Sequence, residues 1–205
     1  MTQTPIRVLV ADDQALIRGA FATLINLESD MTVVAQVGTG DEVLPAALRE
    51  RPDVALLDVQ MPGTDGLAAA AILADRVPDC RVIILTTFGR PGYLRRAIQA
   101  HAAGFMVKDA PPETLIDAIR RVHQGLRVVD PELAAESLTL GESPLTGRER
   151  DVLQATADGG TIGQIAKQLF LSEGTVRNHL SSVIGKTGAA TRAEALRIAT
   201  ERGWI

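Results

Sequence analysis

Five polar side chains end or follow short apolar runs of this 205-residue chain: Asp12, Asp13, Asp58, Thr86 and Lys108. Crowded carboxylates repel one another and need a cation, and Mg²⁺ suits them because it prefers oxygen ligands and keeps several of its waters. A carboxylate beside such a metal can attack phosphorus and form an acyl phosphate. A lysine and a hydroxyl then supply a charge and a hydrogen bond to the phosphoryl oxygens. These residue types predict phosphoryl chemistry if the fold brings them together.

The apolar runs that precede these side chains predict strands, and the amphipathic stretches between them predict helices. The expected strands are Ile6–Ala11, Met31–Val37, Val54–Leu57, Arg81–Leu85 and Gly104–Val107, and the expected helices are Ala15–Leu27, Asp41–Arg51, Gly66–Arg76, Gly92–Ala100 and Pro112–Gln124. This alternation indicates an α/β fold with a five-stranded, doubly wound parallel sheet. A single acidic residue in a loop is usually only a solvated turn or N-cap residue. The carboxyl ends of parallel strands meet at one edge, however, so five such groups there favour a single site.

The rest of the chain has a different pattern. Residues 125–143 contain Pro131 and four acidic residues but no long apolar face, which predicts a linker. Residues 144–205 show only helical signatures, because candidate caps at Thr146, Thr161, Ser172 and Thr191 each precede a short helical stretch. The net charge is −3 for residues 1–124, −3 for the linker and +2 for the last segment. We therefore expect two domains with different partners, the second a small all-α domain of four helices.

Two of these helices, Thr161–Gln168 and Glu173–Lys186, are separated by a short break. Their apolar spacing alone fits a protein-binding bundle almost as well as a helix-turn-helix. The exposed face of the second helix favours DNA, since it carries Arg177, Asn178, Ser181 and Ser182, with Lys186 a turn further on and the hydroxyl of Thr175 near its start. Arginine reads guanine and asparagine reads adenine in the major groove, while hydroxyls contact phosphates.

Residues 1–124 resemble the receiver domain of bacterial two-component response regulators. The resemblance rests on motifs in the order Asp12-Asp13, Asp58-Val-Gln-Met-Pro-Gly-Thr-Asp-Gly66, Thr86 and Gly104-Phe-Met-Val-Lys108. It implies that Asp58 is the phosphoacceptor and that Asp12 and Asp13 form an acidic pocket. It also implies that Asp13, Asp58 and the backbone carbonyl of Gln60 bind Mg²⁺ or Mn²⁺, with Asp12 acting largely through water.

The same resemblance implies a conformational switch. Thr86 would move towards the phosphoryl group, Lys108 would pair with it, and Phe105 would change rotamer with Thr86. Simple packing in the core is the other interpretation of Phe105. Asp109 stands where many receivers have a proline after the lysine, so the sequence leaves the isomer of the Lys108–Asp109 peptide bond open.

Residues 144–205 resemble the LuxR-type helix-turn-helix of the NarL/FixJ regulators. The matching strings are Leu145-Thr-Gly-Arg-Glu-Arg-Asp-Val-Leu153, Ile165-Ala166, Leu171-Ser-Glu-Gly-Thr-Val-Arg-Asn-His179, Lys186-Thr-Gly-Ala189 and Arg192-Ala-Glu-Ala195. The likeness implies that Glu173–Lys186 is the recognition helix, with Lys186 facing a phosphate. Gly163 replaces a frequent lysine, while Gly185 and Thr187 depart from the pattern and should each loosen the helix end by about 1 kcal/mol.

Together these features predict a phosphorylation-gated transcriptional regulator in the cytoplasm, which is not an enzyme beyond slow autodephosphorylation. A histidine kinase or a small phosphodonor would phosphorylate Asp58. The expected result is a homodimer that binds promoter DNA, with RNA polymerase as a further partner. In the family that the chain resembles, the first and fifth receiver helices often pair, here Ala15–Leu27 and Pro112–Gln124, and the last helix of the tail can pair too, so the sequence leaves the dimer surface open. The stretch Thr86–Tyr93 also resembles regulators that control membrane-lipid desaturation in response to temperature.

Two alternatives remain open at this point. A metal-dependent phosphatase also forms a phospho-aspartate, but such enzymes carry a second aspartate two residues after the nucleophile, where this chain has Gln60. A phosphorylation-independent regulator would tolerate loss of the acidic residues that this sequence keeps. No P-loop or Gly-x-Gly-x-x-Gly follows the first strand, which disfavours nucleotide chemistry.

The composition narrows the class further. With 46% hydrophobic and 22% charged residues the chain is globular, and with only 3% aromatic residues it has little material for stacking bases. Its single cysteine, Cys80, cannot form an internal disulfide, which fits a reducing cytosol. The N-terminus does not show a secretory signal, and no apolar run approaches the roughly 18 residues of a membrane span. We therefore expect no membrane insertion.

Overall fold

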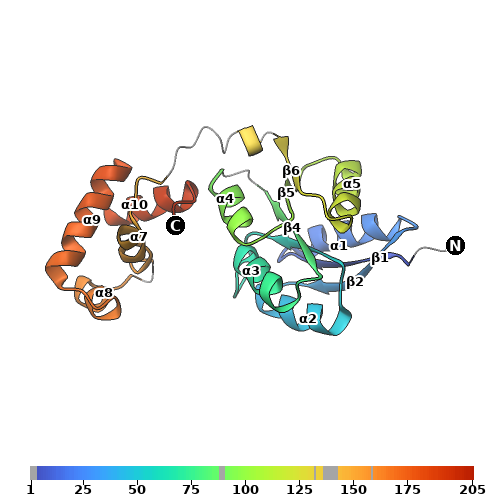
Figure 1. Ribbon diagram of the computed structural model, residues 1–205, viewed down its shortest axis with the longest axis horizontal. Coiled ribbons are helices and arrows are strands. Elements are labelled where there is room, and N and C mark those ends of the chain that lie inside the picture. Colours follow the sequence, from blue (N-terminus) through green and yellow to red (C-terminus); the bar gives the residue numbers. More distant parts are fainter. Residues whose placement is uncertain (1–3, 88–90, 132, 136–142, 158) are drawn as a thin grey trace. The chain divides into compact units, whose positions relative to one another are not determined.

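The computed structural model describes every residue except 1–3, 88–90, 132, 136–142 and 158 (Figure 1). Two compact units make up the chain: the main division between them falls after residue 135, and the short stretch 90–93 groups with the second unit. The first unit runs in the order β1 (Ile6–Ala11), α1 (Ala15–Asn26), β2 (Met31–Val37), a 3₁₀ turn (Gly40–Glu42), α2 (Val43–Glu50), β3 (Val54–Asp58), α3 (Gly66–Arg76), β4 (Arg81–Thr86), α4 (Pro91–Gln99), β5 (Gly104–Val107), α5 (Pro112–His123) and β6 (Val128–Val129). The second contains α7 (Gly147–Gln154), α8 (Ile162–Gln168), α9 (Glu173–Thr187) and α10 (Arg192–Glu201).

The strands of the first unit form one parallel sheet in the order β2-β1-β3-β4-β5-β6. Helices α1 and α5 pack on one face, where an apolar cluster joins them to the strands, and α2, α3 and α4 lie on the other (Figure 1). The inner strands are apolar along most of their length because both of their faces are covered; the exceptions are Arg7, Arg81, Asp58 and Thr86. The predicted fold class, a doubly wound parallel α/β sheet followed by a small helical domain, is confirmed.

The described sheet has six strands, so the predicted number of five is wrong by one short edge strand. The backbone N–H of Val128 donates to the carbonyl of Ala103 at 2.9 Å, and that of Asp130 donates to Phe105 at 3.1 Å. Two strand residues are too few to show the alternation on which strand prediction depends. Strand β6 lies inside the predicted linker, so the first residues of that segment extend the sheet.

The topology brings the ends of β1 and β3 together. The chain leaves β1 for β2 on one side and returns to β3 on the other, and the register pairs Ala11 with Leu57. Such a reversal of strand order opens a crevice at the carboxyl edge of the sheet. Strands β3 and β4 each run one residue beyond the predicted end, so Asp58 and Thr86 are the last residues of their strands.

The second unit contains the four predicted helices. Each begins at a predicted cap, where the hydroxyl of Thr146, Thr161, Ser172 or Thr191 accepts the N–H three residues further on. One apolar cluster joins α7, α9 and α10 and includes Trp204, and another joins α7, α8 and α9. Helix α9 is therefore fixed along one side and exposes the other. Across the described residues, no helix is both long and apolar enough to span a membrane.

Candidate functional site

Three carboxylates gather at the carboxyl edge of the sheet. Asp12 and Asp13 follow β1, Asp58 ends β3, and one oxygen from each lies within 4.8 Å of the others. Asp12 and Asp58 are buried, with relative exposures of 1% and 4%, whereas Asp13 is exposed. The structure thus brings together the three predicted aspartates and leaves one of them open to solvent.

Lys108 lies among these carboxylates. Its Nζ is 2.7 Å from Oδ2 of Asp12 and 3.1 Å from Oδ2 of Asp58, and its side chain is buried. The backbone N–H of Lys108 donates to the carbonyl of Thr86 at 2.8 Å, which continues the pairing of β5 with β4 beyond the last strand residue. This backbone bond places the lysine beside the end of β4, and its two ion pairs bring the side chain to the ends of β1 and β3. Every peptide bond in the described part of the chain, including that between Lys108 and Asp109, is trans.

The cluster carries more negative charge than its lysine balances. Burial is the main cause that raises the pKa of Asp58 above its ordinary value; the charge of Asp12 adds to the rise, and Lys108 and the backbone of Gln60 oppose it. The formal net charge of three carboxylates and one ammonium is −2. Oδ2 of Asp12 and Nζ of Lys108 are buried without an aligned hydrogen bond among the described residues. Oxygen donors with this charge fit a hard divalent cation.

The two predicted switch residues lie on neighbouring strands. Thr86 ends β4 and is buried, and Phe105 in β5 is 1% exposed. The register pairs Ile84 with Phe105, and side chains alternate between the faces of a strand. The side chains of Thr86 and Phe105 therefore point to the same face of the sheet. They lie on neighbouring strands, and Thr86 is two residues further along β4 than Ile84, the partner of Phe105.

The loop between β3 and α3 is held by close backbone approaches. A Cβ on Gly66 would lie 1.9 Å from the carbonyl oxygen of Asp58, so only glycine fits there. Gly63 has a positive φ of 74°, a conformation that glycine adopts without strain. The carboxylate of Asp41 accepts the N–H of Thr64 at 3.1 Å and its hydroxyl at 2.6 Å. These contacts fix the course of the chain immediately after Asp58.

Two supporting residues were not predicted from the sequence. Asp41 looked like the start of a helix, but it instead anchors the loop through Thr64. The guanidinium of Arg18 on α1 donates to the backbone carbonyl of Asp12 and so holds the loop that follows β1. Both act on the backbone of another segment. Sequence spacing carries no signal for such contacts, apart from the cluster of glycines around the Asp41 anchor.

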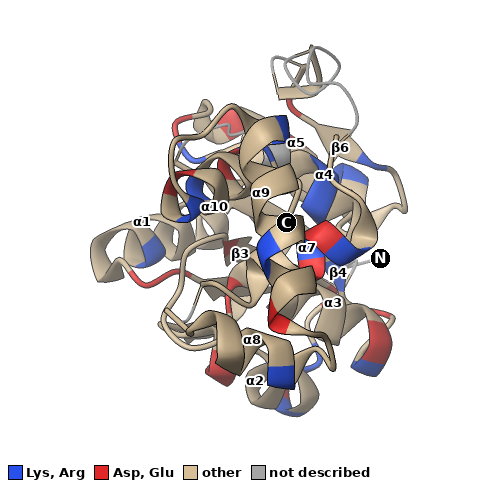
Figure 2. Cartoon of the chain, turned by 90° about the vertical axis from the view of Figure 1, so that its left-hand side faces the viewer, with Lys and Arg blue, Asp and Glu red and all other residues tan. Residues whose placement is uncertain are grey.

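Three of the five predicted DNA-binding residues lie on the exposed side of α9. Arg177, Asn178 and Ser181 are exposed, and the hydroxyl of Thr175 lies 2.8 Å from that of the N-cap residue Ser172. Figure 2 shows charges of both signs along α7 and one short basic stretch on α8, so these helices carry no continuous basic band. The face of α9 thus presents two hydrogen-bonding side chains suited to base edges, flanked by hydroxyls.

Both cationic residues of this helix are paired with glutamates. Arg177 contacts Glu173 one turn earlier at 2.8 Å. Lys186, which was predicted to face a phosphate, contacts Glu149 of α7 at 2.7 Å. The sequence showed Glu149 only as the second half of a capping box with Thr146, a role that the structure confirms. Its contact with α9 was not predicted.

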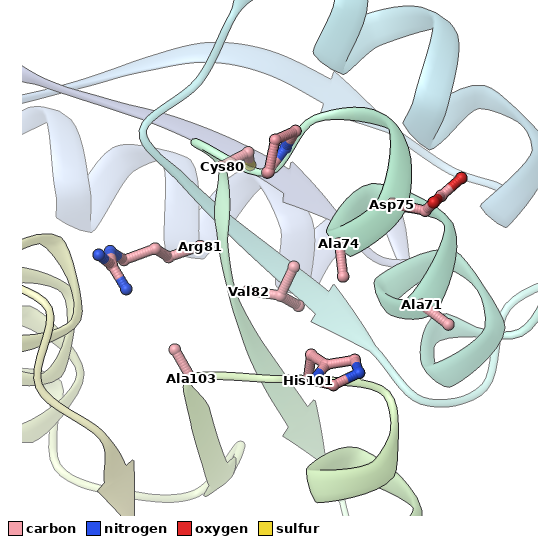
Figure 3. Close-up of a pocket in the computed structure, with 9 residues that line it drawn as sticks. Ala71, Ala74, Asp75, Cys80, Arg81, Val82, His101 and Ala103 are labelled. Carbon is pink, nitrogen blue, oxygen red and sulfur yellow. The ribbon is translucent and has the colours of Figure 1, made fainter.

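A separate cavity of about 570 Å³ lies between α3, the start of β4 and the segment before β5. Its lining includes the small side chains of Ala71, Ala74 and Ala103, and the side chains of Asp75 and Arg81 point in opposite directions (Figure 3). None of the predicted site residues lines it. It lies at the amino end of β4, whereas Thr86 marks the carboxyl end, so it does not belong to the carboxylate cluster.

Comparison with known families agrees with this geometry. Residues 8–120 match the response regulator receiver domain, and residues 143–199 match the bacterial regulatory proteins of the luxR family. The chain belongs to the response regulators, with a receiver domain followed by a LuxR-type DNA-binding domain, as in the NarL/FixJ transcriptional regulators. The resemblance inferred from the motifs is confirmed.

Among individual proteins, two Bacillus subtilis regulators are similar over their whole length. The transcriptional regulatory protein YvfU is 46% identical over 98% of this chain and 100% of its own, and the transcriptional regulatory protein DesR is 44% identical over 98% and 99%. The crystal structure of the response regulator ChrA, from a heme-sensing two-component system, aligns with a TM-score of 0.60 and 32% identity over 99% of this chain and 100% of that one. An RcsB–DNA complex aligns at 0.68 with 22% identity, over 97% and 99%, and shares the fold.

Proposed function

We propose that phosphorylation of Asp58 gates DNA binding by this regulator by favouring association of two copies. The observation that carries the proposal is the cluster of three carboxylates within 4.8 Å, with the ammonium of Lys108 3.1 Å from Asp58. We assign residues 1–124 together with β6 to the receiver, the rest of residues 125–143 to the linker and residues 144–205 to the DNA-binding domain. We further propose that the protein acts on promoter DNA in the cytoplasm.

The carboxylates would hold Mg²⁺ or Mn²⁺ through Asp13, Asp58 and the backbone carbonyl of Gln60, with Asp12 acting through water. When bound, the cation supplies positive charge that offsets the phosphoryl oxygens. Asp13 is the exposed member of the cluster, so the site opens to solvent on its side. The net charge of −2 at the cluster is the physical reason for a divalent ion.

Asp58 acts as the nucleophile. One carboxylate oxygen attacks phosphorus in a phosphohistidine of a sensor kinase or in acetyl phosphate. The P–O bond to Asp58 forms while the bond to the leaving group breaks, and the leaving nitrogen or oxygen keeps the electron pair. Lys108 is already in place to pair with a phosphoryl oxygen, because its Nζ is 3.1 Å from the carboxylate of Asp58, to which the phosphoryl group would be attached.

The signal would leave the site through β4 and β5. Thr86 donates its hydroxyl to the phosphoryl group, and Phe105, on the same face of the sheet, follows it. The expected shift continues through residues 87–92 into α4, although residues 88–90 of that loop lie outside the described residues. Phosphorylation biases an equilibrium between two conformations and shifts it only as far as the interaction energies differ.

Paired copies would bind promoter DNA through α9. Arg177 and Asn178 contact base edges, Ser181 permits a close approach, and Thr175 contacts a phosphate beside the helix N-terminus. Two linked domains raise the effective concentration at the second half-site, which couples dimerisation to affinity. The partners are a cognate sensor kinase, promoter DNA, a second copy of the chain and RNA polymerase. Hydrolysis of the phospho-aspartate is at most slow and serves to reset the switch.

The test compares the full chain with its Asp58→Ala variant, with and without acetyl phosphate and Mg²⁺. Asp79→Ala is the matched control, because Asp79 is an exposed aspartate in the turn before β4. We expect acetyl phosphate to increase dimer mass in analytical ultracentrifugation and retardation of promoter DNA for the parent and the control. The Asp58→Ala variant should respond in neither assay. An equal response in all three chains would refute the proposal, and steady turnover of a phosphomonoester would favour an enzyme instead.

A further inference from the structure

One carboxylate, that of Glu149, joins the start of α7 to the second half of α9. Its Oε2 accepts the backbone N–H of Thr146 at 2.6 Å, and its Oε1 accepts the hydroxyl of Ser182 at 2.6 Å. The Nζ of Lys186 lies 2.9 Å from Oε1 and 2.7 Å from Oε2. Residues four apart share one face of a helix, so two successive turns of α9 contact the same carboxylate.

This carboxylate is buried and fully partnered. The side chain of Glu149 is only 5% exposed. Burial acts to raise its pKa, but the bonds from Lys186, Ser182 and Thr146 outweigh burial and lower the pKa to about 2. Glu149 is therefore ionised at neutral pH, and removal of Lys186 would leave a buried charge without its counterion. That loss is strongly destabilising, unlike the loss of a surface pair.

The other ion pair of α9 differs in this respect. The side chains of Arg177 and Glu173 are 59% and 54% exposed, and they lie one turn apart on the same helix. Exposed pairs of this kind contribute little to stability and exchange readily with water. Arg177 is therefore free to leave Glu173 for a base edge. Lys186 has no comparable freedom, because its departure would leave the buried, negatively charged carboxylate of Glu149 without a counterion.

We propose that Glu149 and Lys186 form a positioning pair, which sets α9 against α7 for DNA binding, and that Lys186 stays on Glu149 and does not contact a phosphate. This inference rests on the proposed function, since it requires α9 to be the recognition helix. It reassigns the role expected of Lys186 from the sequence. Glu149, which the motif marked only as a helix cap, becomes a determinant of the geometry of DNA recognition.

Salt dependence distinguishes a positioning lysine from a phosphate-contacting one. Each lost phosphate contact reduces the slope of log K against log salt by about 0.9. The probe is a duplex selected from a random pool with the phosphorylated full chain. We expect Lys186→Met to weaken binding about tenfold, a coupling typical of residues in contact, without changing the slope. Lys186→Arg, which keeps the charge, should recover most of the affinity.

A double-mutant cycle tests whether the two residues act as a pair. Glu149→Gln and Lys186→Met should each lower the affinity for DNA. The double variant should bind DNA no more weakly than the single variant with the lower affinity. Trp204 is the single tryptophan of the chain and packs in the cluster that contains Val183 of α9. Its fluorescence should therefore shift in both single variants, which reports a displaced α9.

Matched controls separate the possible failures. Arg197→Met breaks an exposed pair with Glu201 on α10 and should change neither affinity nor fluorescence. If Arg177→Ala leaves affinity unchanged, α9 is not the recognition helix and the proposed function itself fails. Arg177→Ala can instead weaken binding, which keeps α9 as the recognition helix. In that case the positioning pair is refuted if Lys186→Met reduces the magnitude of the slope of log K against log salt by about 0.9. It is also refuted if Lys186→Met changes neither the affinity nor this slope.

Discussion

Charge balance at single residues separates two kinds of buried carboxylate in this chain. Around Asp58, three carboxylates share one ammonium, and burial keeps the pKa of Asp58 raised. The carboxylate of Glu149, by contrast, pairs with the ammonium of Lys186 and accepts hydrogen bonds from a hydroxyl and a backbone N–H. These contacts lower its pKa to about 2. The first arrangement is short of positive charge and suits a cation and a phosphoryl group. The second is satisfied within the protein and suits a structural connection.

At this scale we predict that Asp13→Asn weakens Mg²⁺ binding while leaving the fold intact. Asp13 is exposed and borders two buried carboxylates, so its loss removes a ligand without opening a cavity. A ligand at 100 times its Kd stabilises a folded protein by about 2.7 kcal/mol. Thermal unfolding with increasing MgCl₂ should show a rising midpoint for the parent and a much smaller rise for the variant. Asp79→Asn is the control, and an unchanged Mg²⁺ response in Asp13→Asn would exclude Asp13 as a ligand.

The residues of the carboxylate cluster could be predicted because they occupy strand ends. A parallel sheet brings such ends to one edge, so Asp58 and Lys108 required only a correct order of strands. Arg18 and Asp41 could not be found this way, because each bonds to the backbone of another segment: Arg18 to Asp12 before its helix, and Asp41 to Thr64 in the loop after β3. The partner of Lys186 was missed for a similar reason, since the packing angle of two helices decides which carboxylate the lysine reaches.

At the scale of elements, the loop after β3 links the nucleophile to α3. Gly66 is the first residue of α3, and its Cα lies against the carbonyl of Asp58. Asp65 caps the same helix by accepting the N–H of Ala68 at 2.7 Å and also pairs with Arg96 of α4 at 3.3 Å. A displacement of this loop would therefore reach the phosphoacceptor, α3 and α4 together.

We predict opposite outcomes for two glycine-to-alanine substitutions. Gly66→Ala places a Cβ 1.9 Å from the carbonyl oxygen of Asp58, so the loop must move, and both stability and phosphorylation by acetyl phosphate should fall. Gly19→Ala is the matched substitution inside α1, where the new Cβ meets nothing within 4 Å beyond its neighbouring residues and the backbone of its own helix. It should stabilise the chain by about 0.5–1 kcal/mol and leave phosphorylation unchanged. Urea unfolding and phosphoprotein mass spectrometry measure both effects, and normal phosphorylation of Gly66→Ala would show that the loop tolerates displacement.

At the scale of the whole molecule, the receiver does not end where its last predicted helix ends. Strand β6 pairs Val128 with Gly104 and Val129 with Phe105, one of the predicted switch residues. Leu133, further along, is buried. The segment that leads towards the DNA-binding domain is thus attached to β5, which contains Phe105 and ends one residue before Lys108. A change in β5 reaches this connection directly.

This attachment predicts that receivers of different length differ in stability. A fragment of residues 1–135 keeps β6 and Leu133, whereas a fragment of residues 1–124 loses both. Two backbone hydrogen bonds at about 1 kcal/mol each, with about 2 kcal/mol for a buried leucine, give an expected difference in unfolding free energy of about 3–4 kcal/mol in urea. Leu133→Ala in the longer fragment should remove about half of this gain, because it keeps the strand and loses the side chain. Equal stability of the two fragments would show that β6 is an incidental contact and would return the domain boundary to residue 124.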